Sequence, residues 1–251
     1  MTQAPDGSGT TPPVRSDPTP YVSFTARAAG ASEGPYASLN LADHVGDDPA
    51  AVAANRDVAA RRVGLTGSDL AVMQAAHGNQ WALVSEPGTV PLVDILVTTT
   101  AGLGLVALAA DCVPIALVDP VAGVAAAVHS GWRGVAVDTA GTAVAAMVES
   151  GAEPSRIQAI LGPAICPSCY EVSPDVRDEV VAAAPAAFAH TAQGTPSVAL
   201  HAAVTEQLQR AGVNAIDADP TCTAESAELF SYRRDGLTGR QGVVVRVPAT
   251  S

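Results

Sequence analysis

The stretch ADCVPIALVDPVAGVAAAVHSGWRG, residues 110–134, decides the fold of this chain. It contains two apolar runs, 113–118 and 123–128, which are typical of buried strands. Only the turn around Asp119 and Pro120 separates them. A crossover helix cannot fit into so short a connection, so the two strands must be antiparallel. The sheet that contains this hairpin is therefore expected to be mixed.

Similar patterns on both sides of the hairpin predict the other regular elements. Strands are expected at 93–98, 103–109, 157–161 and 242–247, and helices at about 49–63, 139–150, 174–184 and 198–211. Asp47 or Asp48 can cap the first helix and Ser173 the third, and Gly64 and Gly151 follow the ends of the first two. No G-x-G-x-x-G motif follows the first strand, so a dinucleotide-binding fold is not indicated. We predict an α/β fold with layered helices and mixed sheets.

Length and composition favour one large folded unit. The 251 residues are 48% hydrophobic, which is enough for a sizeable core. Residues 1–20 are rich in Pro, Gly, Ser and Thr and have little to bury, so we expect a disordered tail followed by a single domain at 21–251. The tail has no basic or apolar region typical of a secretory signal, which predicts a cytoplasmic protein.

The net charge of the chain disfavours some classes of binding partner. The chain has 13 basic and 25 acidic side chains, a formal net charge of −12, which disfavours binding to nucleic acid or to an anionic membrane surface. A small anionic substrate can still bind through a local cluster of arginines. In a reducing compartment the four cysteines are expected to be thiols or metal ligands.

Three residues suggest a metal centre. His77, Cys112 and His129 each lie at the end of a predicted strand, next to Gly or Pro. One such residue alone is usually structural, but two imidazoles and a thiolate together suit zinc, and three protein ligands leave the fourth position open for catalysis. Structural sites take ligands in close pairs, whereas these three lie far apart in the sequence. We therefore predict a catalytic zinc ion whose removal reduces activity more than folding.

Neighbouring residues suggest roles in substrate binding and catalysis. Arg133, between Trp132 and Gly134, has the planar guanidinium that suits a phosphate. Asp111 can act as a general base, can orient a ligand histidine, or can cap a turn. The pair Cys166-x-x-Cys169 can be a redox dithiol or half of a second metal site. We interpret the pair as incidental, because Cys222 alone cannot complete four ligands.

Many ordered motifs give the chain a resemblance to a known family over residues 21–247. The chain resembles the YfiH or laccase-domain proteins, also called the multicopper polyphenol oxidase or peptidoglycan editing factor family. The matching segments are Ser38-Leu-Asn40-Leu, Asn55-Arg56, Gln74-x-x-His77-Gly78, Ala110-Asp111-Cys112-x-Pro114, His129-Ser-Gly-Trp132-Arg133-Gly134, Gly162-Pro163-x-Ile165, Cys169-Tyr170-Glu171-Val172, Cys222-Thr223 and the segment from Phe230 through Arg233-Arg234-Asp235 to Arg240.

The resemblance implies an α/β/β/α layered fold and one zinc ion on the residues that match His77, Cys112 and His129. It also implies purine nucleoside phosphorylase activity with adenosine deaminase and methylthioadenosine phosphorylase side activities, so that the small-molecule partners are a purine nucleoside and phosphate. On the same basis Arg56 is a second phosphate ligand. Asn40 and Gln74 can contact substrate or can anchor loops.

The names given to this family describe different activities, so other functions must be compared with the phosphorylase. A laccase with a trinuclear copper cluster needs roughly ten imidazoles, and the chain has five histidines. A lone blue-copper site could use Met73 as its axial ligand, but it needs no neighbouring arginine, so we disfavour copper. A cysteine hydrolase acting on a peptidoglycan precursor would use Cys112 as nucleophile and His129 as base, without zinc. A binding module would show no turnover.

Overall fold

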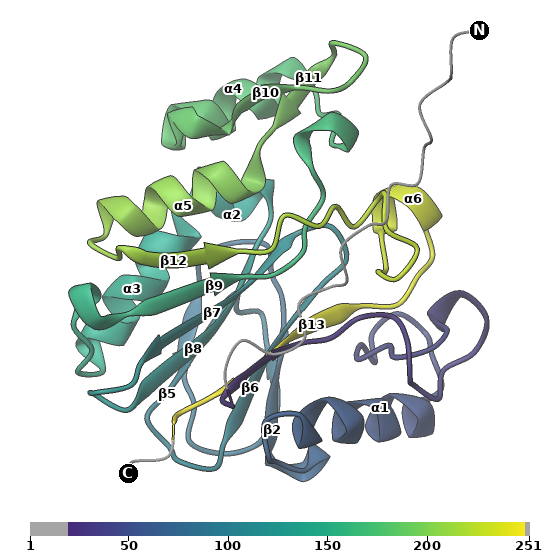
Figure 1. Cartoon of the computed structure of the whole chain (residues 1–251), viewed down its shortest axis with the longest axis vertical. Helices are drawn as coiled ribbons and strands as arrows, with labels where there is room; N and C mark the ends of the chain where they lie inside the picture. The colour runs from purple at the N-terminus through teal and green to yellow at the C-terminus, as the bar shows by residue number, and fades with distance from the viewer. Residues whose placement is uncertain (1–19, 249–251) are drawn as a thin grey trace, which may run out of the picture.

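A computed structural model describes residues 20–248. Two β-sheets pack face to face, and helices cover both outer sides, so the layers run α/β/β/α (Figure 1). The predicted α/β fold with mixed sheets is confirmed. The tail predicted at 1–20 lies, except for Pro20, outside the described residues.

The first sheet has five strands in the order β1-β13-β6-β2-β4. Strand β13 is antiparallel to both β1 and β6, whereas β2 is parallel to β6 and β4. The bounds are β1 Val22–Phe24, β2 Leu70–Gln74, β4 Gly88–Pro91, β6 Gly104–Ala109 and β13 Gln241–Arg246.

The second sheet has six strands in the order β12-β9-β7-β8-β5-β3. At its centre lies the predicted antiparallel hairpin, in which Val113 pairs with Ser130 and Asp119 with Val124. The bounds are β3 Trp81–Leu83, β5 Ile95–Thr98, β7 Val113–Asp119, β8 Val124–Ser130, β9 Gln158–Leu161 and β12 Ala215–Ala218. A separate antiparallel pair joins β10 (Phe188–His190) to β11 (Pro196–Val198).

The helices are divided between the two outer faces. Helix α1 (Pro49–Arg61) covers the first sheet, and Asp48 caps it by accepting a hydrogen bond from the Ala50 amide at 3.0 Å. On the side of the second sheet lie α2 (Trp132–Ala136), α3 (Thr139–Glu149) and α5 (Leu200–Arg210), and α4 (Pro174–Ala183) packs on α2. Helix α6 (Tyr232–Asp235) precedes β13.

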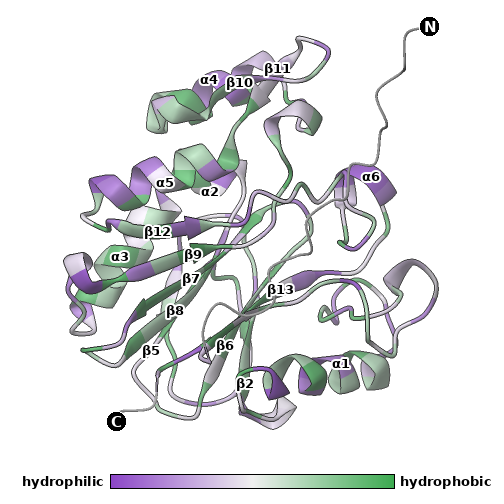
Figure 2. Cartoon of the chain, in the orientation of Figure 1, coloured by the Kyte–Doolittle hydropathy of each residue, from purple (hydrophilic) through white to green (hydrophobic). Residues whose placement is uncertain are grey.

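Successive side chains of the central hairpin point to opposite faces of the second sheet, and both faces are buried. Ile115 and Leu117 face the helices, whereas Ala116 and Val118 face the other sheet. Strand β8 repeats the pattern, with the small Ala125 and Ala127 between the sheets. Small residues here let the sheets approach closely. Figure 2 shows hydrophobic residues along β7 and β8 and hydrophilic residues on α6.

Within residues 20–248 no helix combines the length and the apolar character needed to cross a membrane.

Candidate metal centre

The fold brings together the three residues proposed as metal ligands. His77 follows β2, Cys112 lies in the turn between β6 and β7, and His129 is in β8. One donor atom from each lies within 4.8 Å of the others, and the two imidazole rings meet edge to face at 4.9 Å between centroids. In a tetrahedral zinc site such donors are about 3.3–3.8 Å apart, so small side-chain movements suffice. The cluster can therefore hold a metal ion.

The local backbone is shaped to make this approach possible. His77 and Asp111 both adopt positive φ angles, 62° and 94°, which cost free energy for residues other than glycine. Gly131 lies against the thiol, since a Cβ atom there would be only 2.7 Å from Cys112 Sγ. The Gly of the His-Ser-Gly-Trp segment is therefore required for the thiol to reach its position.

Asp94, at the start of β5, orients both histidines. Its side chain is fully buried, and its Oδ1 lies 2.9 Å from His129 Nδ1. The same carboxylate accepts hydrogen bonds from the backbone amides of His77 at 2.9 Å and Gly78 at 2.7 Å. Because Nδ1 of His129 is engaged by Asp94, Nε2 is left for a metal. The sequence argument missed this residue and considered Asp111 for the role, although a lone carboxylate directly before a buried strand was a visible signal.

The electrostatics around the two imidazoles differ. Burial and the neighbouring His129 lower the pKa of His77 from its ordinary value, which favours the neutral imidazole that binds metals. Burial alone would also lower the pKa of His129, but the nearby Cys112 sulfur and the hydrogen bond with Asp94 outweigh burial and raise it to about 10. A cation at the centre would displace that proton.

The cluster opens into a cleft of about 820 Å³. The cleft carries three kinds of side chain that suit a substrate. Besides the metal-type residues, it is lined by the aromatic residues Trp132, Tyr170 and Tyr232, by the arginines Arg133, Arg233 and Arg240, and by Gln74, His44, Asp111 and apolar neighbours.

The three cleft arginines are arranged to leave their charge available. Arg133 stacks on Trp132 at 4.3 Å and Arg233 on Tyr170 at 5.0 Å, both measured from the guanidinium carbon to the ring centroid. Arg240 donates only to the carbonyls of residues 238 and 239, and burial lowers its pKa. Among residues 20–248, none of the three forms an ion pair with a carboxylate. The many acidic side chains in the sequence favour structural ion pairs for Arg233 and Arg240, and the structure corrects that expectation.

Asp111 lies at the cleft wall, but its carboxylate is already engaged. It accepts hydrogen bonds from Thr223 Oγ1 at 2.6 Å, Ser231 Oγ at 2.7 Å and the Arg233 amide at 2.7 Å. These bonds attach the segment around α6 to the turn that carries Cys112. The arrangement matches the turn-anchoring alternative more closely than a free base.

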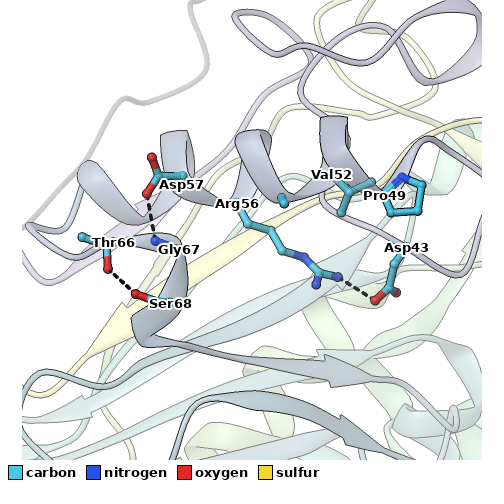
Figure 3. A pocket seen from close by; sticks show the side chains of 9 residues that line it. Asp43, Pro49, Val52, Arg56, Asp57, Thr66, Gly67 and Ser68 are labelled. Carbon is cyan, nitrogen blue, oxygen red and sulfur yellow. Dashed lines mark hydrogen bonds and ion pairs between the residues drawn. The ribbon is translucent and has the colours of Figure 1, made fainter.

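Two residues expected to bind substrate lie elsewhere. Asn40 is fully buried, and its side chain bonds the backbone of Ala42 and of Arg240 and the side chain of Asp47. Arg56 lines a separate pocket beside α1, where Figure 3 shows it directed at Asp43. It forms an ion pair with Asp43 at 3.2 Å and donates to the Leu41 carbonyl at 2.9 Å. Of the expected substrate ligands, only Gln74 and Arg133 line the cleft.

Two other residues of the matching segments are structural. Arg234 pairs with Asp235 at 2.8 Å and donates to the carbonyls of Thr223, Ser226 and Leu229. Phe230 is an aromatic residue that could flank a base by its chemistry alone, but it is fully buried, packs against Arg27 and does not line the cleft.

Comparisons with known proteins agree with this fold and place the chain in a family. The family model described as "Multi-copper polyphenol oxidoreductase laccase" matches residues 21–248. A purine nucleoside phosphorylase of Streptomyces coelicolor is 49% identical over 223 residues, which cover 88% of this chain and 92% of the relative. An adenosine deaminase from an unknown prokaryotic organism is 35% identical over 80% of this chain and 84% of its own.

A solved structure carries the same fold. The crystal structure of YlmD from Geobacillus stearothermophilus superposes with a TM-score of 0.84 and is 35% identical, and the match covers 91% of this chain and 94% of that one. The names of the relatives support an enzymatic function and a small-molecule substrate.

Proposed function

This chain belongs to the multi-copper polyphenol oxidoreductase laccase family, and on that premise we propose that it is a zinc-dependent purine nucleoside phosphorylase with adenosine deaminase as a second activity. The proposed substrates are adenosine, inosine, guanosine and methylthioadenosine. The observation that carries the proposal is the convergence of His77, Cys112 and His129 at a cleft that also contains three arginines, none of which pairs with a carboxylate among residues 20–248.

Zinc fits the donors better than copper does. Two imidazoles and a thiolate with an open position form a catalytic zinc set, and Asp94 supplies the carboxylate that commonly orients a ligand histidine. Five histidines in the chain cannot furnish a multicopper site. When bound, zinc supplies Lewis-acid polarisation of a substrate donor atom at its open position.

The arginines supply the phosphate site in this proposal. Arg133, Arg233 and Arg240 come from different elements but line one cleft. A guanidinium binds a phosphate through two parallel hydrogen bonds, and a cation without a carboxylate partner is free to do so. Asp111 acts here as a positioning residue, because its carboxylate accepts a hydrogen bond from the Arg233 amide.

The aromatic side chains supply the purine site. Trp132, Tyr170 and Tyr232 line the cleft close to the arginines, and a planar base stacks favourably on such rings. Gln74 lines the same cleft and can donate to or accept from the edge of a base. The proposed base site therefore lies beside the phosphate site, as phosphorolysis requires.

Phosphorolysis then proceeds by substitution at the ribose. A phosphate oxygen forms the new bond to C1′, the bond from C1′ to N9 breaks, and its electron pair leaves with the purine. The hydrogen of hydrogen phosphate ends on the purine, so the products are ribose 1-phosphate and the free base. Holding both reactants in one geometry removes much of the entropic barrier. Deamination of adenosine instead adds water at C6 and releases ammonia.

A product screen tests the proposal. The purified zinc-loaded chain is incubated with adenosine, inosine, methylthioadenosine and a UDP-muramoyl-serine precursor, each with and without phosphate. We expect free base and ribose 1-phosphate from adenosine and inosine only when phosphate is present. Turnover of the muramoyl precursor alone would contradict the proposal.

A specific observation supports one alternative, a cysteine hydrolase that edits peptidoglycan precursors. Cys112 and His129 form a close pair, and the raised pKa of His129 suits an imidazolium beside a nucleophilic sulfur. The third donor, His77, has no role in that chemistry. Chelation separates the two readings, because a cysteine hydrolase keeps its activity after the metal is removed.

A further inference from the structure

A second cluster of metal-type side chains lies outside the cleft. It consists of Cys166, Cys169, Cys222 and Glu225, whose donor atoms all lie within 4.8 Å of one another. The first two come from the connection between β9 and α4, and the other two follow β12. The four are therefore two pairs with the same spacing, Cys-x-x-Cys and Cys-x-x-Glu. The sequence argument counted only thiols and so did not include Glu225.

We propose that this Cys3Glu cluster binds one Zn²⁺ ion as a closed, four-coordinate structural site. Structural zinc takes four protein ligands in tetrahedral geometry, commonly in close pairs, whereas catalytic zinc keeps an open position. Thiolates around zinc are about 3.8 Å apart, a spacing within the 4.8 Å limit of the cluster. The donor set and the pairing both correspond to the structural class.

The backbone already holds the sulfur atoms in place. The short 3-10 turn Pro167–Cys169 is closed by a hydrogen bond from the Cys169 amide to the Cys166 carbonyl at 3.1 Å. The Cys166 amide donates to Cys222 Sγ at 3.2 Å, and amide donors of this kind stabilise metal-bound thiolates. The Thr223 amide bonds the Ala164 carbonyl at 3.1 Å and fixes the second segment beside the first.

The donor types also suit a divalent cation, because thiol and carboxylate groups bind zinc as anions. Arg234 holds the second segment in place, since its guanidinium pairs with Asp235 and donates to the carbonyls of Thr223 at 2.9 Å and Ser226 at 2.7 Å, on either side of Glu225. A disulfide between Cys166 and Cys169 would engage neither Cys222 nor Glu225.

The position of the cluster gives the ion a mechanical role. Cys169 directly precedes Tyr170, which lines the cleft, and Cys222 directly precedes Thr223, which bonds Asp111 at 2.6 Å. A metal at the Cys3Glu cluster would therefore join two connections that form the cleft wall. This inference does not rest on the proposed function, and its failure would leave the His77 site unaffected.

Metal analysis of the full chain tests the inference. The wild type, Cys112→Ala, Cys169→Ser and the double variant are incubated with excess zinc, desalted, and analysed by mass spectrometry for metal per chain. Two zinc ions are expected in the wild type, one in each single variant, and none in the double variant. A folded Cys112→Ala chain that retains no zinc would overturn the inference.

Cobalt spectroscopy keeps the test decisive if Cys169→Ser fails to fold. In Co²⁺-loaded Cys112→Ala, thiolate-to-cobalt charge-transfer absorption can arise only from the remaining cysteines, and we expect it at one equivalent. Its absence would overturn the inference. So would a mass for the unreduced Cys112→Ala chain that is lower by two hydrogens, because that mass indicates a disulfide between two of the cysteines of the cluster.

Discussion

The two metal-type clusters of this chain differ in how their donors are distributed along the sequence. His77, Cys112 and His129 come from three distant segments, and they converge only because β2, β7 and β8 meet at one cleft. The Cys3Glu cluster instead draws its donors from two short pairs. The first set leaves a coordination position open, whereas the second provides four donors. If the proposals hold, the difference teaches that the proposed catalytic centre depends on the fold, whereas the proposed structural centre supports it.

The largest expected effect is a loss of activity in one cluster and of thermal stability in the other. Cys112→Ala should reduce kcat/KM for adenosine phosphorolysis by about 10³-fold or more, because the Lewis acid loses a ligand, and it should keep a cooperative thermal transition. Cys169→Ser should show the reverse pattern, with measurable turnover and a Tm lower by roughly 10 °C. Steady-state kinetics and calorimetry on both variants check this.

Full turnover in Cys112→Ala would end the assignment of catalysis to the first cluster. An unchanged Tm in Cys169→Ser would remove the supporting role of the second. His77→Ala provides a matched variant, since it removes a ligand of the same centre from a different segment and should reproduce the loss seen in Cys112→Ala.

Asp119 provides a control that should change stability without changing metal binding. It lies at the turn of the central hairpin, away from both clusters. Its buried carboxylate accepts hydrogen bonds from the amides of Val121, Ala122 and Glu153 and from Arg156. Asp119→Asn should lower the free energy of unfolding by about 2 to 3 kcal/mol, with no change in metal per chain. Urea unfolding together with metal analysis measures both.

The effect of Asp119 should depend on pH in one direction. Burial alone would raise the pKa of Asp119, but the hydrogen bonds from Arg156 and the backbone outweigh it and lower the pKa. The stabilisation is therefore complete above the unfolded pKa of about 3.9. It is lost as the pH falls through the folded pKa. A difference between wild type and Asp119→Asn that grew on acidification would contradict this account.

Asp94 and Asp111 are two buried carboxylates beside the first cluster, and their substitution should affect zinc binding differently. Asp94→Asn should weaken zinc binding by about 30-fold, because an amide cannot accept all of the bonds that orient the two histidines. Asp111→Asn is the matched control, since its carboxylate bonds Thr223, Ser231 and the Arg233 amide instead. Competition with a zinc chelator measures both, and equal losses would show that Asp94 has no special role.

The smallest expected effect concerns phosphate. Arg133→Ala should raise the KM for phosphate by about 10-fold, the size expected for one charge-assisted contact, and should change the KM for nucleoside less. Arg56→Ala removes an arginine that pairs with Asp43 outside the cleft and should leave the phosphate KM unchanged. The opposite ordering of the two KM changes would remove Arg133 from the phosphate site.

Much of the fold could be predicted from local pattern. Helix α1 begins at Pro49 behind an Asp48 cap, and the hairpin of β7 and β8 pairs as its short turn requires. The strands that were not predicted are short: β1, β3, β4, β10, β11 and β12 have three or four residues, too few to show a clear alternation, and β2 has five. Helix α2 was also missed, since five residues are too few to show a helical period.

The site was less predictable, because it depends on long-range contacts. The three metal-type residues could be selected by chemistry. The position of Asp94 before a buried strand marked it as a candidate, but its partner His129 depends on strand pairing, and the place of Arg240 in the cleft depends on loop packing. Arg56 was expected to bind phosphate from the resemblance, yet it pairs with Asp43 outside the cleft. For Asn40 the sequence left substrate contact and loop anchoring open, and its side chain bonds the neighbouring loop. A polar residue in a shared motif can serve the loop rather than the substrate.

Anomalous scattering at the zinc edge, from crystals of the zinc-loaded chain, tests the central claim most directly. The account predicts a peak about 2.0–2.3 Å from Cys112 Sγ, His129 Nε2 and a ring nitrogen of His77, with a solvent molecule or substrate as the fourth ligand. A peak elsewhere with none between these three residues would contradict it, as would a fourth protein donor that closes the site.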